Sequence, residues 1–241
     1  MTERPSEDIG YAVLLNISKA AGLNRWMFES ILPYVGGKTL EIGSGIGNIS
    51  SVFVSNNRSL FLSDYKEEYC SLLKERFAGE PEIKGIFRID LAAKDFETRH
   101  AGLLGTFDTV FALNVIEHIE DDTLAVANCA KLLTPGGRLI LLLPAYQALF
   151  NRWDLQLGHY RRYTERSVRV LLSGELEVIK TWHFNLAGIF GWFLFGSVFR
   201  RGLIAKGQIK AYEALIPLFR FADWITFRRI GLSVIGIGRK K

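Results

Sequence analysis

Short apolar runs alternate with segments of helical spacing between residues 38 and 143. This alternation is typical of βαβ units that build a parallel sheet. Helices are predicted at 66–77 and 121–133, and the second of them begins at Asp121 or Asp122 as N-cap. The following Pro135-Gly136-Gly137 is expected to form a turn into the last strand of this region. Five strands are predicted, at residues 39–42, 60–62, 85–89, 109–113 and 139–143.

Further elements flank this core on both sides. Helices are predicted at 9–21 and 25–34, separated by Gly22-Leu23-Asn24, and they either cap a cofactor site or pad the sheet. Beyond residue 144, Thr164 is a predicted N-cap for a helix that runs to residue 172. Alternating strands at 177–181 and 232–237 are expected to pair as an antiparallel hairpin at the sheet edge.

The predicted fold is a Rossmann-like α/β sheet of seven mostly parallel strands with an antiparallel last strand. We expect one domain that is made of four parts. They are an N-terminal helical cap (1–36), a cofactor-binding core (37–183), an apolar helical insertion (184–229) and the last strand (230–241).

The insertion begins with an uncharged run at 184–199, which Arg200-Arg201 follow directly. The run is shorter than the ~20 residues of a transmembrane helix, so no membrane span is predicted. A second helix, kinked by Pro217, is predicted at 208–229. The insertion is a lid over a ligand-binding site, an interfacial membrane contact or a subunit interface, and each of these favours a bulky or lipophilic ligand. The apolar residues of the second helix at helical spacing are Ile209, Tyr212, Ile216, Phe219 and Phe227.

Charge is distributed unevenly along the 241 residues, whose net charge is +5. Residues 1–144 hold 14 Lys and Arg against 19 Asp and Glu, whereas residues 145–241 hold 16 against 6. A basic half suits an anionic membrane surface, nucleic acid or a phosphorylated substrate. The two cysteines, Cys70 and Cys129, lack Cys or His partners at metal-ligand spacing, so no disulfide and no metal site are predicted. The polar N-terminus is unlike a secretory signal, and we expect a cytoplasmic protein, with peripheral binding at the inner membrane face left open.

A glycine loop follows the first predicted strand, in Leu40-Glu41-Ile42-Gly43-Ser44-Gly45-Ile46-Gly47. Glycines allow the backbone to turn sharply and approach a ligand, and the next helix points its N–H groups at it. The dinucleotide fingerprint Gly-x-Gly-x-x-Gly requires glycine where Asn48 stands, which disfavours NAD.

Acidic residues end three consecutive predicted strands, at Glu41, Asp64 and Asp90. Carboxyl ends of parallel strands meet at the edge where α/β sheets bind ligands. At that edge, Asp64 is placed to accept hydrogen bonds from ribose hydroxyls and Asp90 from an adenine amine. Three carboxylates suit S-adenosylmethionine, which carries an ammonium and a sulfonium, better than a pyrophosphate.

These features resemble the class I S-adenosylmethionine-dependent methyltransferases, in the branch that contains ubiquinone and menaquinone methyltransferases. Besides the loop and the acids, the resemblance rests on Phe107-Asp108-Thr109-Val110, on Asn114-Val115-Ile116-Glu117-His118-Ile119 and on Leu132-Leu133-Thr134-Pro135-Gly136-Gly137, and it covers about residues 24–183. It implies S-adenosylmethionine as the cofactor. The residues it assigns to cofactor binding are Glu41, Gly43, Ser44, Gly45, Gly47, Asp64, Tyr65, Asp90, Leu91 and Asn114.

A second segment, from Pro144 to Thr164, resembles bacterial methyltransferases associated with glycosyltransferases and with polysaccharide or glycolipid pathways. It follows the fifth strand and therefore lies on the acceptor side. Arg161 or Arg162 either binds an anionic acceptor group or pairs with Asp154 or Glu165. The predicted acceptor-binding residues are Tyr146, Tyr160, Arg161, Arg162 and Tyr163.

Methyl transfer to a hydroxyl or an acidic carbon needs a general base, and histidine is the best suited near neutral pH. The candidates are His118 and His159, each with a packing role as the alternative; His100 and His183 are interpreted as structural.

The sequence therefore predicts a methyltransferase that acts on a small molecule, with a lipid-linked, sugar-containing or otherwise bulky lipophilic acceptor favoured. A quinone-type C- or O-methyltransferase and an RNA methyltransferase are the alternatives, although no nucleic-acid partner is expected. Two further hypotheses lie outside the methyltransferases. They are an oxidoreductase that uses NAD and a nucleoside-binding module without enzymatic activity. Peripheral membrane contact through 184–229 and a homodimer are the partner hypotheses.

Overall fold

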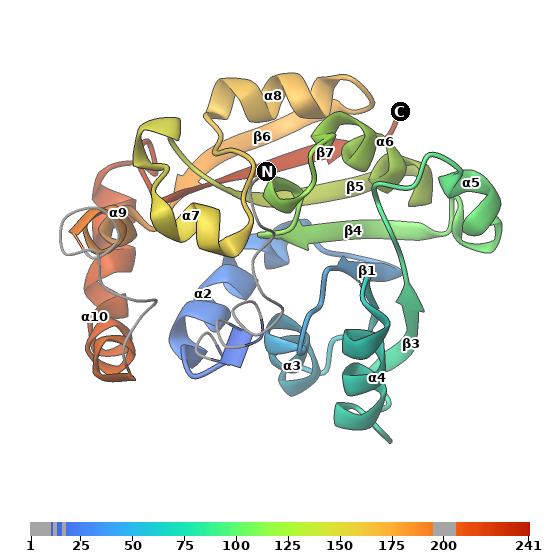
Figure 1. The fold of residues 1–241 in the computed structure, drawn as a ribbon, viewed down its shortest axis with the longest axis horizontal. Coiled ribbons are helices and arrows are strands. Elements are labelled where there is room, and N and C mark those ends of the chain that lie inside the picture. Colours follow the sequence, from blue (N-terminus) through green and yellow to red (C-terminus); the bar gives the residue numbers. More distant parts are fainter. Residues whose placement is uncertain (1–10, 12–13, 16–17, 195–205) are drawn as a thin grey trace.

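The computed structural model describes residues 11, 14–15, 18–194 and 206–241. Its centre is a seven-stranded sheet in the order β3-β2-β1-β4-β5-β7-β6 (Figure 1). Strand β7 runs antiparallel to both of its neighbours, and the other paired strands are parallel. The predicted Rossmann-like fold is confirmed. The strands are β1 Thr39–Ile42, β2 Leu60–Asp64, β3 Ile83–Arg88, β4 Phe107–Leu113, β5 Leu133–Pro144, β6 Glu177–Phe184 and β7 Ser233–Arg239.

Helices cover both faces of the sheet, with α6 and α8 on one side and α2, α3 and α4 on the other (Figure 1). Short 3₁₀ turns, η1 Leu32–Tyr34, η2 Ala101–Leu103, η3 Ile116–His118 and η4 Gln147–Leu149, connect them. The helices are α2 Ala21–Ile31, α3 Asn48–Ser55, α4 Glu67–Arg76, α5 Phe96–Arg99, α6 Asp122–Leu132, α7 Arg152–Leu157, α8 Glu165–Ser173, α9 Leu186–Gly191 and α10 Lys206–Ile225.

The central strands are apolar on both faces because both faces are covered. In β5, Leu139 and Leu141 pack with the helices α6 and α8, whereas Ile140 packs on the opposite side with α2 and α3. In β4, Phe111 faces that second side and stacks on Phe53 of α3 with 5.2 Å between ring centroids. Successive side chains of a strand point to opposite faces, so one apolar run fills two cores.

Strand order reverses between β1 and β4, which are neighbours in the sheet although β2 and β3 lie between them in sequence. The loops that follow β1 and β4 therefore leave the sheet side by side, which is where open α/β sheets bind ligands. An added Cβ at Gly43, in the loop after β1, would lie only 2.5 Å from a methyl carbon of Val115, after β4. This edge positions the candidate site.

Two predicted breaks between elements were wrong. Gly22-Leu23-Asn24 does not interrupt the N-terminal helices, since α2 runs through it from Ala21. The carboxylate of Glu213 accepts hydrogen bonds from the backbone N–H groups of Gly22 (2.6 Å) and Leu23 (3.1 Å), which satisfies the open end of the helix. Pro135-Gly136-Gly137 forms no turn ahead of the strand. It lies in a bulge of β5, because Leu133 already pairs with Phe107 while Arg138 pairs with Thr109.

Helix α10 anchors the insertion with acidic residues at two places. Besides Glu213, Asp223 accepts hydrogen bonds from the backbone N–H groups of Asn185 and Leu186, both at 2.8 Å, at the start of α9. The predicted stripe of Tyr212, Ile216 and Phe219 packs into the core. The prediction that Phe227 continues this stripe was wrong. The helix ends at Ile225, and Phe227 lies beyond it with 80% of its surface exposed.

The predictions for Arg200, Arg201 and the side chain of Ile209 lie outside the described residues. Among the helices of the described residues, none is long and apolar enough to cross a membrane.

Candidate active site

The glycine loop turns tightly between β1 and α3. Gly43 and Gly47 have φ angles of +69° and +81°, a backbone conformation that side chains other than glycine rarely adopt. Ser44 ties the loop to β2, because its N–H donates to the carbonyl of Ser63 (2.8 Å). Ala at Gly47 would also place its Cβ 2.5 Å from the Phe77 ring. Sequence alone explained these glycines by ligand approach, and the fold adds close packing beneath the loop.

Asp64 ends β2 beside this loop, as predicted. Its carboxylate accepts hydrogen bonds from the backbone N–H groups of Gly45 (3.0 Å) and Lys66 (3.0 Å). Burial raises the pKa of Asp64, although these hydrogen bonds oppose the rise. Each carboxylate oxygen has two lone pairs, so both retain an acceptor site for ribose hydroxyls.

Glu41 lies beneath the loop rather than on its surface. Its side chain is buried, and its Oε2 accepts a hydrogen bond of 2.5 Å from the hydroxyl of Ser50 in α3. Burial raises the pKa of Glu41 to about 7. This carboxylate therefore braces the start of α3 under the loop.

Replacing Glu41 with Gln is expected to make stability less dependent on pH. The raised pKa means that the folded chain binds this proton more tightly than the unfolded chain does, so the stability that Glu41 contributes is lost as pH rises from about 4.5 to 7. The free energy of unfolding of E41Q minus that of the wild type should increase by roughly 2–3 kcal/mol from pH 5 to pH 8. Urea denaturation at both pH values measures it. A difference in free energy of unfolding between E41Q and the wild type that is the same at pH 5 and pH 8 would contradict the prediction. Glu177→Gln, at an exposed glutamate, serves as the control.

The other predicted cofactor residues have diverse positions. Asp90 is not at a strand end as predicted, because β3 ends at Arg88, and its Oδ1 accepts from the N–H of Ala92 (2.9 Å). Leu91 is buried in the core, whereas Tyr65 is exposed. Asn114, after β4, is exposed and has a φ of +56°. Their roles in cofactor binding stay predictions.

In the segment that follows β5, an aspartate orients one of the predicted bases. His159 Nδ1 lies 2.8 Å from Oδ1 of Asp154, whose side chain is fully buried. The same Asp154 oxygen accepts from Nε of Arg162 (2.8 Å), and the other oxygen accepts from the N–H of Asn151 (2.9 Å). Although burial raises the pKa of Asp154, His159 and Arg162 together hold it below its ordinary value. An ionised Asp154 can only accept, so Nδ1 of His159 donates, and in the neutral imidazole Nε2 is then the nitrogen that carries the lone pair.

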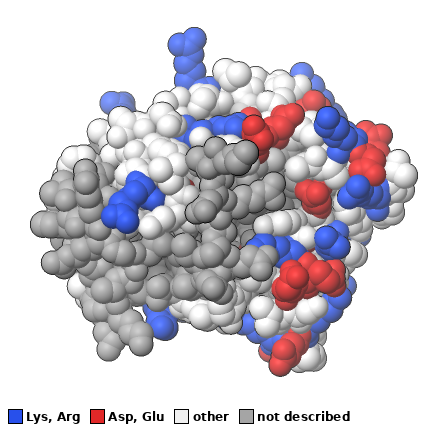
Figure 2. Space-filling model, in the orientation of Figure 1, with Lys and Arg blue, Asp and Glu red and all other residues white. Residues whose placement is uncertain are grey.

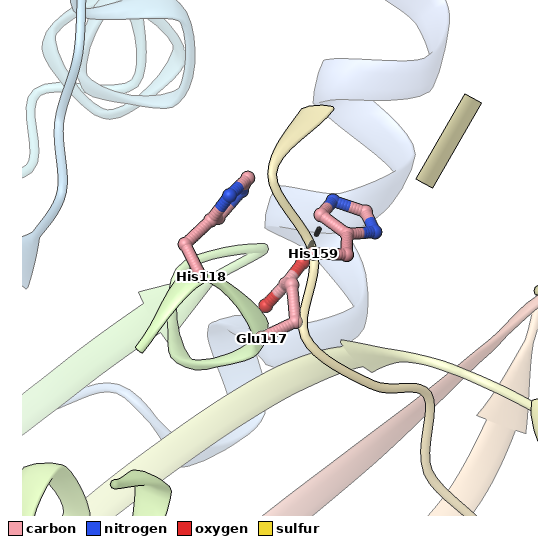
Figure 3. A group of neighbouring side chains, drawn as sticks. All are labelled: Glu117, His118 and His159. Carbon is pink, nitrogen blue, oxygen red and sulfur yellow. Dashed lines mark ion pairs between the residues drawn. The ribbon is translucent and has the colours of Figure 1, made fainter. Parts of the chain in front are cut away.

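The two predicted bases lie next to each other. The rings of His118 and His159 have centroids 4.7 Å apart, and Nε2 of His159 lies 4.0 Å from Oε1 of Glu117 (Figure 3). Glu117 is completely buried, and burial raises its pKa to about 7. No described residue donates a hydrogen bond to either of its carboxylate oxygens. The turn η3 supplies Glu117 and His118, and the loop after α7 supplies His159.

Most of the predicted acceptor residues lie in the segment after α7, and several of them are engaged in contacts within the protein. Arg162 is buried against Asp154, as the structural interpretation expected, and its guanidinium lies 4.5 Å from the Trp192 ring centroid. Arg161 pairs with Asp122 (3.0 Å), which also accepts from the hydroxyl of the buried Tyr163 (2.9 Å).

The remaining two tyrosines differ in exposure. Tyr146 stacks on His183, with ring centroids 5.2 Å apart, and its φ of +61° is unusual for a bulky residue. Tyr160 is half exposed, and the guanidinium of Arg161 lies 5.8 Å from the centroid of its ring.

Sequence reasoning overlooked Glu117 as a functional side chain and considered Asp154 only as a partner for arginine. The signal for Asp154 was its place five residues before His159 in a polar loop. The buried state of Glu117 has no local signal, because it depends on loops separated by about 40 positions in the chain.

Comparisons with known proteins agree with this geometry. A family described as a methyltransferase domain matches residues 40–139, less than half of the chain. A ubiquinone biosynthesis O-methyltransferase of Xanthomonas oryzae is 28% identical over 110 residues, which are 46% of this chain and 44% of that protein. The protein of the same name from Thiobacillus denitrificans is 28% identical over 113 residues, 47% and 46% of the two chains. The chain thus spans less than half the length of these curated relatives.

Solved structures share the fold over most of the chain. A S-adenosylmethionine-dependent methyltransferase from Archaeoglobus fulgidus has a TM-score of 0.58 at 12% identity, covering 91% of this chain and 94% of that one. The N-methyltransferase NodS from Bradyrhizobium japonicum, solved with S-adenosylhomocysteine, has a TM-score of 0.54 at 17% identity, covering 90% and 84%.

The order of the strands, the glycine loop after β1 and the acid Asp64 at the end of β2 are typical of a Rossmann-like protein that binds a cofactor. The methyltransferase-domain match covers residues 40–139, and the fold is shared with S-adenosylmethionine-dependent methyltransferases of known structure. The predicted class, and S-adenosylmethionine as the cofactor of that class, are confirmed.

Proposed function

We propose that this protein transfers a methyl group from S-adenosylmethionine to an oxygen of a lipophilic small molecule. The observation that carries the proposal is the meeting of two groups at one sheet edge. The glycine loop, whose Gly43 packs on Val115 after β4, and Asp64 would hold the cofactor there. His159, oriented by Asp154, lies 4.0 Å from Glu117 in the turn that follows Val115.

S-adenosylmethionine supplies an electrophilic methyl group on a good leaving group. The chain mainly has to hold the acceptor oxygen in line with that carbon and exclude water, which supplies several kcal/mol. As the new C–O bond forms, the C–S bond breaks with its electron pair staying on sulfur. Nε2 of His159 takes the hydroxyl proton, and Asp154 stabilises the resulting imidazolium.

Two observations support an oxygen acceptor that is lipophilic. The curated relatives are named as O-methyltransferases of ubiquinone biosynthesis. The surface of the insertion is strongly apolar, as described below. A quinone-type or a lipid-linked, sugar-containing acceptor satisfies both.

Replacing Asp64 with Ala should weaken S-adenosylmethionine binding by about 10–100-fold, because hydrogen bonds to a charged group contribute roughly 1.5–3 kcal/mol. Isothermal titration of the wild type, D64A and D64N with S-adenosylmethionine and with NAD measures it. Asp95→Ala is the matched control, since that aspartate pairs with Arg99 on the surface.

Unchanged affinity in D64A would refute the ribose role. A wild type that bound NAD and not S-adenosylmethionine would refute the proposed function.

A large apolar surface lies on the outer face of α10 and on the turn that follows it. Trp224 is 70% exposed and Phe221, which stacks on it, is 54% exposed. Arg228 and Arg229 follow the exposed Phe227 in the sequence. Apolar side chains flanked by arginines suit the interface of an anionic membrane, where a lipophilic acceptor resides. We therefore favour the membrane contact over the lid and the dimer. The exposed apolar residues are Leu215, Leu218, Phe221, Trp224, Ile225, Phe227 and Ile230.

The double variant F221S/W224S is expected to bind anionic vesicles at least tenfold more weakly than the wild type, since each large apolar side chain contributes roughly 1.5–3 kcal/mol on burial. Flotation with phosphatidylglycerol-containing liposomes measures it. Val170→Ser, on the exposed face of α8, is the control. A wild type that does not float would exclude the membrane contact and favour the lid or the dimer.

The surface charge supports a small acceptor rather than RNA. On the face seen in Figure 2, described basic side chains are interspersed with acidic ones instead of forming a continuous band. Arginines of the basic half are also engaged in ion pairs, for example Arg220 with Glu29 and Arg239 with Glu177. Paired arginines contribute less to binding a phosphate backbone.

A further inference from the structure

Three potential metal ligands converge where the turn after β4 meets the loop after α7. Glu117, His118 and His159 each offer one ligand atom, and these atoms all lie within 4.8 Å of one another (Figure 3). They come from two segments that the fold brings together, the turn after β4 and the loop after α7.

The Glu117 carboxylate is the strongest indication that a ligand belongs here. A buried carboxylate normally accepts several hydrogen bonds, and leaving it without them is costly. No described residue donates to Oε1 or Oε2 of Glu117, although the side chain is fully buried and its Oε1 faces His159. A cation among the three residues would satisfy both oxygens.

His159 has the second partner that metal-binding histidines usually have. Nδ1 binds the carboxylate of Asp154, so Nε2 presents its lone pair toward Glu117. A carboxylate behind a histidine fixes the ring and raises its basicity as a ligand. Asp154 is itself fixed by Arg162 and by the N–H of Asn151. Asp154 and Arg162 would therefore hold the His159 ring in place before a metal binds.

Ligand distances require only a modest contraction. Ligand atoms around a tetrahedral zinc with bonds of about 2.0–2.1 Å lie about 3.3 Å apart. The Nε2–Oε1 distance is 4.0 Å, and no two of the three ligand atoms are more than 4.8 Å apart. Two imidazoles and one carboxylate favour a first-row transition metal over Mg²⁺ or Ca²⁺, which prefer oxygen ligands. Three protein ligands leave a coordination position open.

We infer that Glu117, His118 and His159 bind one divalent transition metal ion of the Zn²⁺, Mn²⁺ or Fe²⁺ type at the acceptor site. The inference departs from the sequence prediction of no metal site, which rested on ligands close together in the chain. Its catalytic meaning rests on the proposed function. An acceptor hydroxyl in the open position loses its proton to solvent more easily, and the metal then replaces the imidazole as the activating group.

The test measures metal binding directly, using Co²⁺ as a spectroscopic probe of the zinc site. Chelator-treated, dialysed protein is titrated with Co²⁺ and followed by visible absorption, with calorimetry using Zn²⁺ in parallel. The wild type is expected to bind one equivalent, and E117Q and H118A at least tenfold more weakly. His100→Ala removes an imidazole from outside the cluster and should bind like the wild type. Circular dichroism of E117Q and H118A verifies that a loss of metal binding is not a loss of folding.

Several outcomes would overturn the inference. They are no stoichiometric binding by the wild type, binding by E117Q and H118A as tight as that of the wild type, or stoichiometric binding of Mg²⁺ but not of Co²⁺. S-adenosylmethionine titration of the same metal-free protein separates the two proposals. Binding of S-adenosylmethionine without metal binding leaves the methyltransferase with an imidazole base, whereas metal binding alone refutes the proposed function and leaves the metal site standing.

Discussion

Replacing His159 with alanine is expected to lower kcat by roughly 10²–10⁴-fold, the usual contribution of a positioned acid–base group. The affinity for S-adenosylmethionine should change by less than about twofold, which is under 0.5 kcal/mol, because the glycine loop and Asp64 are distinct from this residue. The expectation holds whether Nε2 takes a proton or binds a metal, since both need its lone pair. Single-turnover assays with saturating cofactor measure the effect.

A second variant keeps this prediction independent of folding. His159→Gln retains an N–H that can donate to Asp154, but it cannot accept a proton near neutral pH. We expect it to lose activity as H159A does, and His100→Ala to keep it. Full turnover in both His159 variants would mean that catalysis depends on positioning of the acceptor alone.

Asp154→Ala is expected to destabilise the fold by about 3–5 kcal/mol, because it leaves the guanidinium of Arg162 buried without its partner. For a chain of this size, that corresponds to a fall in Tm of roughly 6–20 °C. Thermal unfolding followed by circular dichroism measures it. Asp154→Asn should cost less, since its amide oxygen can still accept from Arg162.

The matched control breaks an exposed ion pair. Glu177 and Arg239 pair at 2.6 Å with both side chains about half exposed, so Glu177→Ala should cost less than about 1 kcal/mol. A D154A protein as stable as E177A would show that the buried pair of Asp154 and Arg162 does not hold α7 and the loop after it together.

The fold was predictable because its signal is local. Runs such as those of β1 and β4 have the right length and apolar character, and Asp121 caps α6 with a 2.9 Å hydrogen bond from the N–H of Leu124, as its position indicated. Errors arose where a distant residue decides the local structure. Glu213 completes α2 from the other end of the chain, and β4 draws the Pro135 segment into a bulge.

The candidate site was predictable only in part. Motifs identified Asp64 and the two histidines, because these types stand at strand ends and in polar loops. The orienting Asp154 and the isolated carboxylate of Glu117 could not be recognised, since hydrogen bonding and burial are properties of the assembled loops. The paired state of Arg161 was equally hidden, because its partner Asp122 begins a helix about 40 positions earlier.

The hydrogen bond between Glu213 and Gly22 spans 191 positions. During synthesis, the N-terminal helix α2 leaves the ribosome long before its cap exists. Contacts so distant in sequence form late, because the loop between them must close first. Helix α2 therefore gains the carboxylate that completes its open end only after α10 has docked.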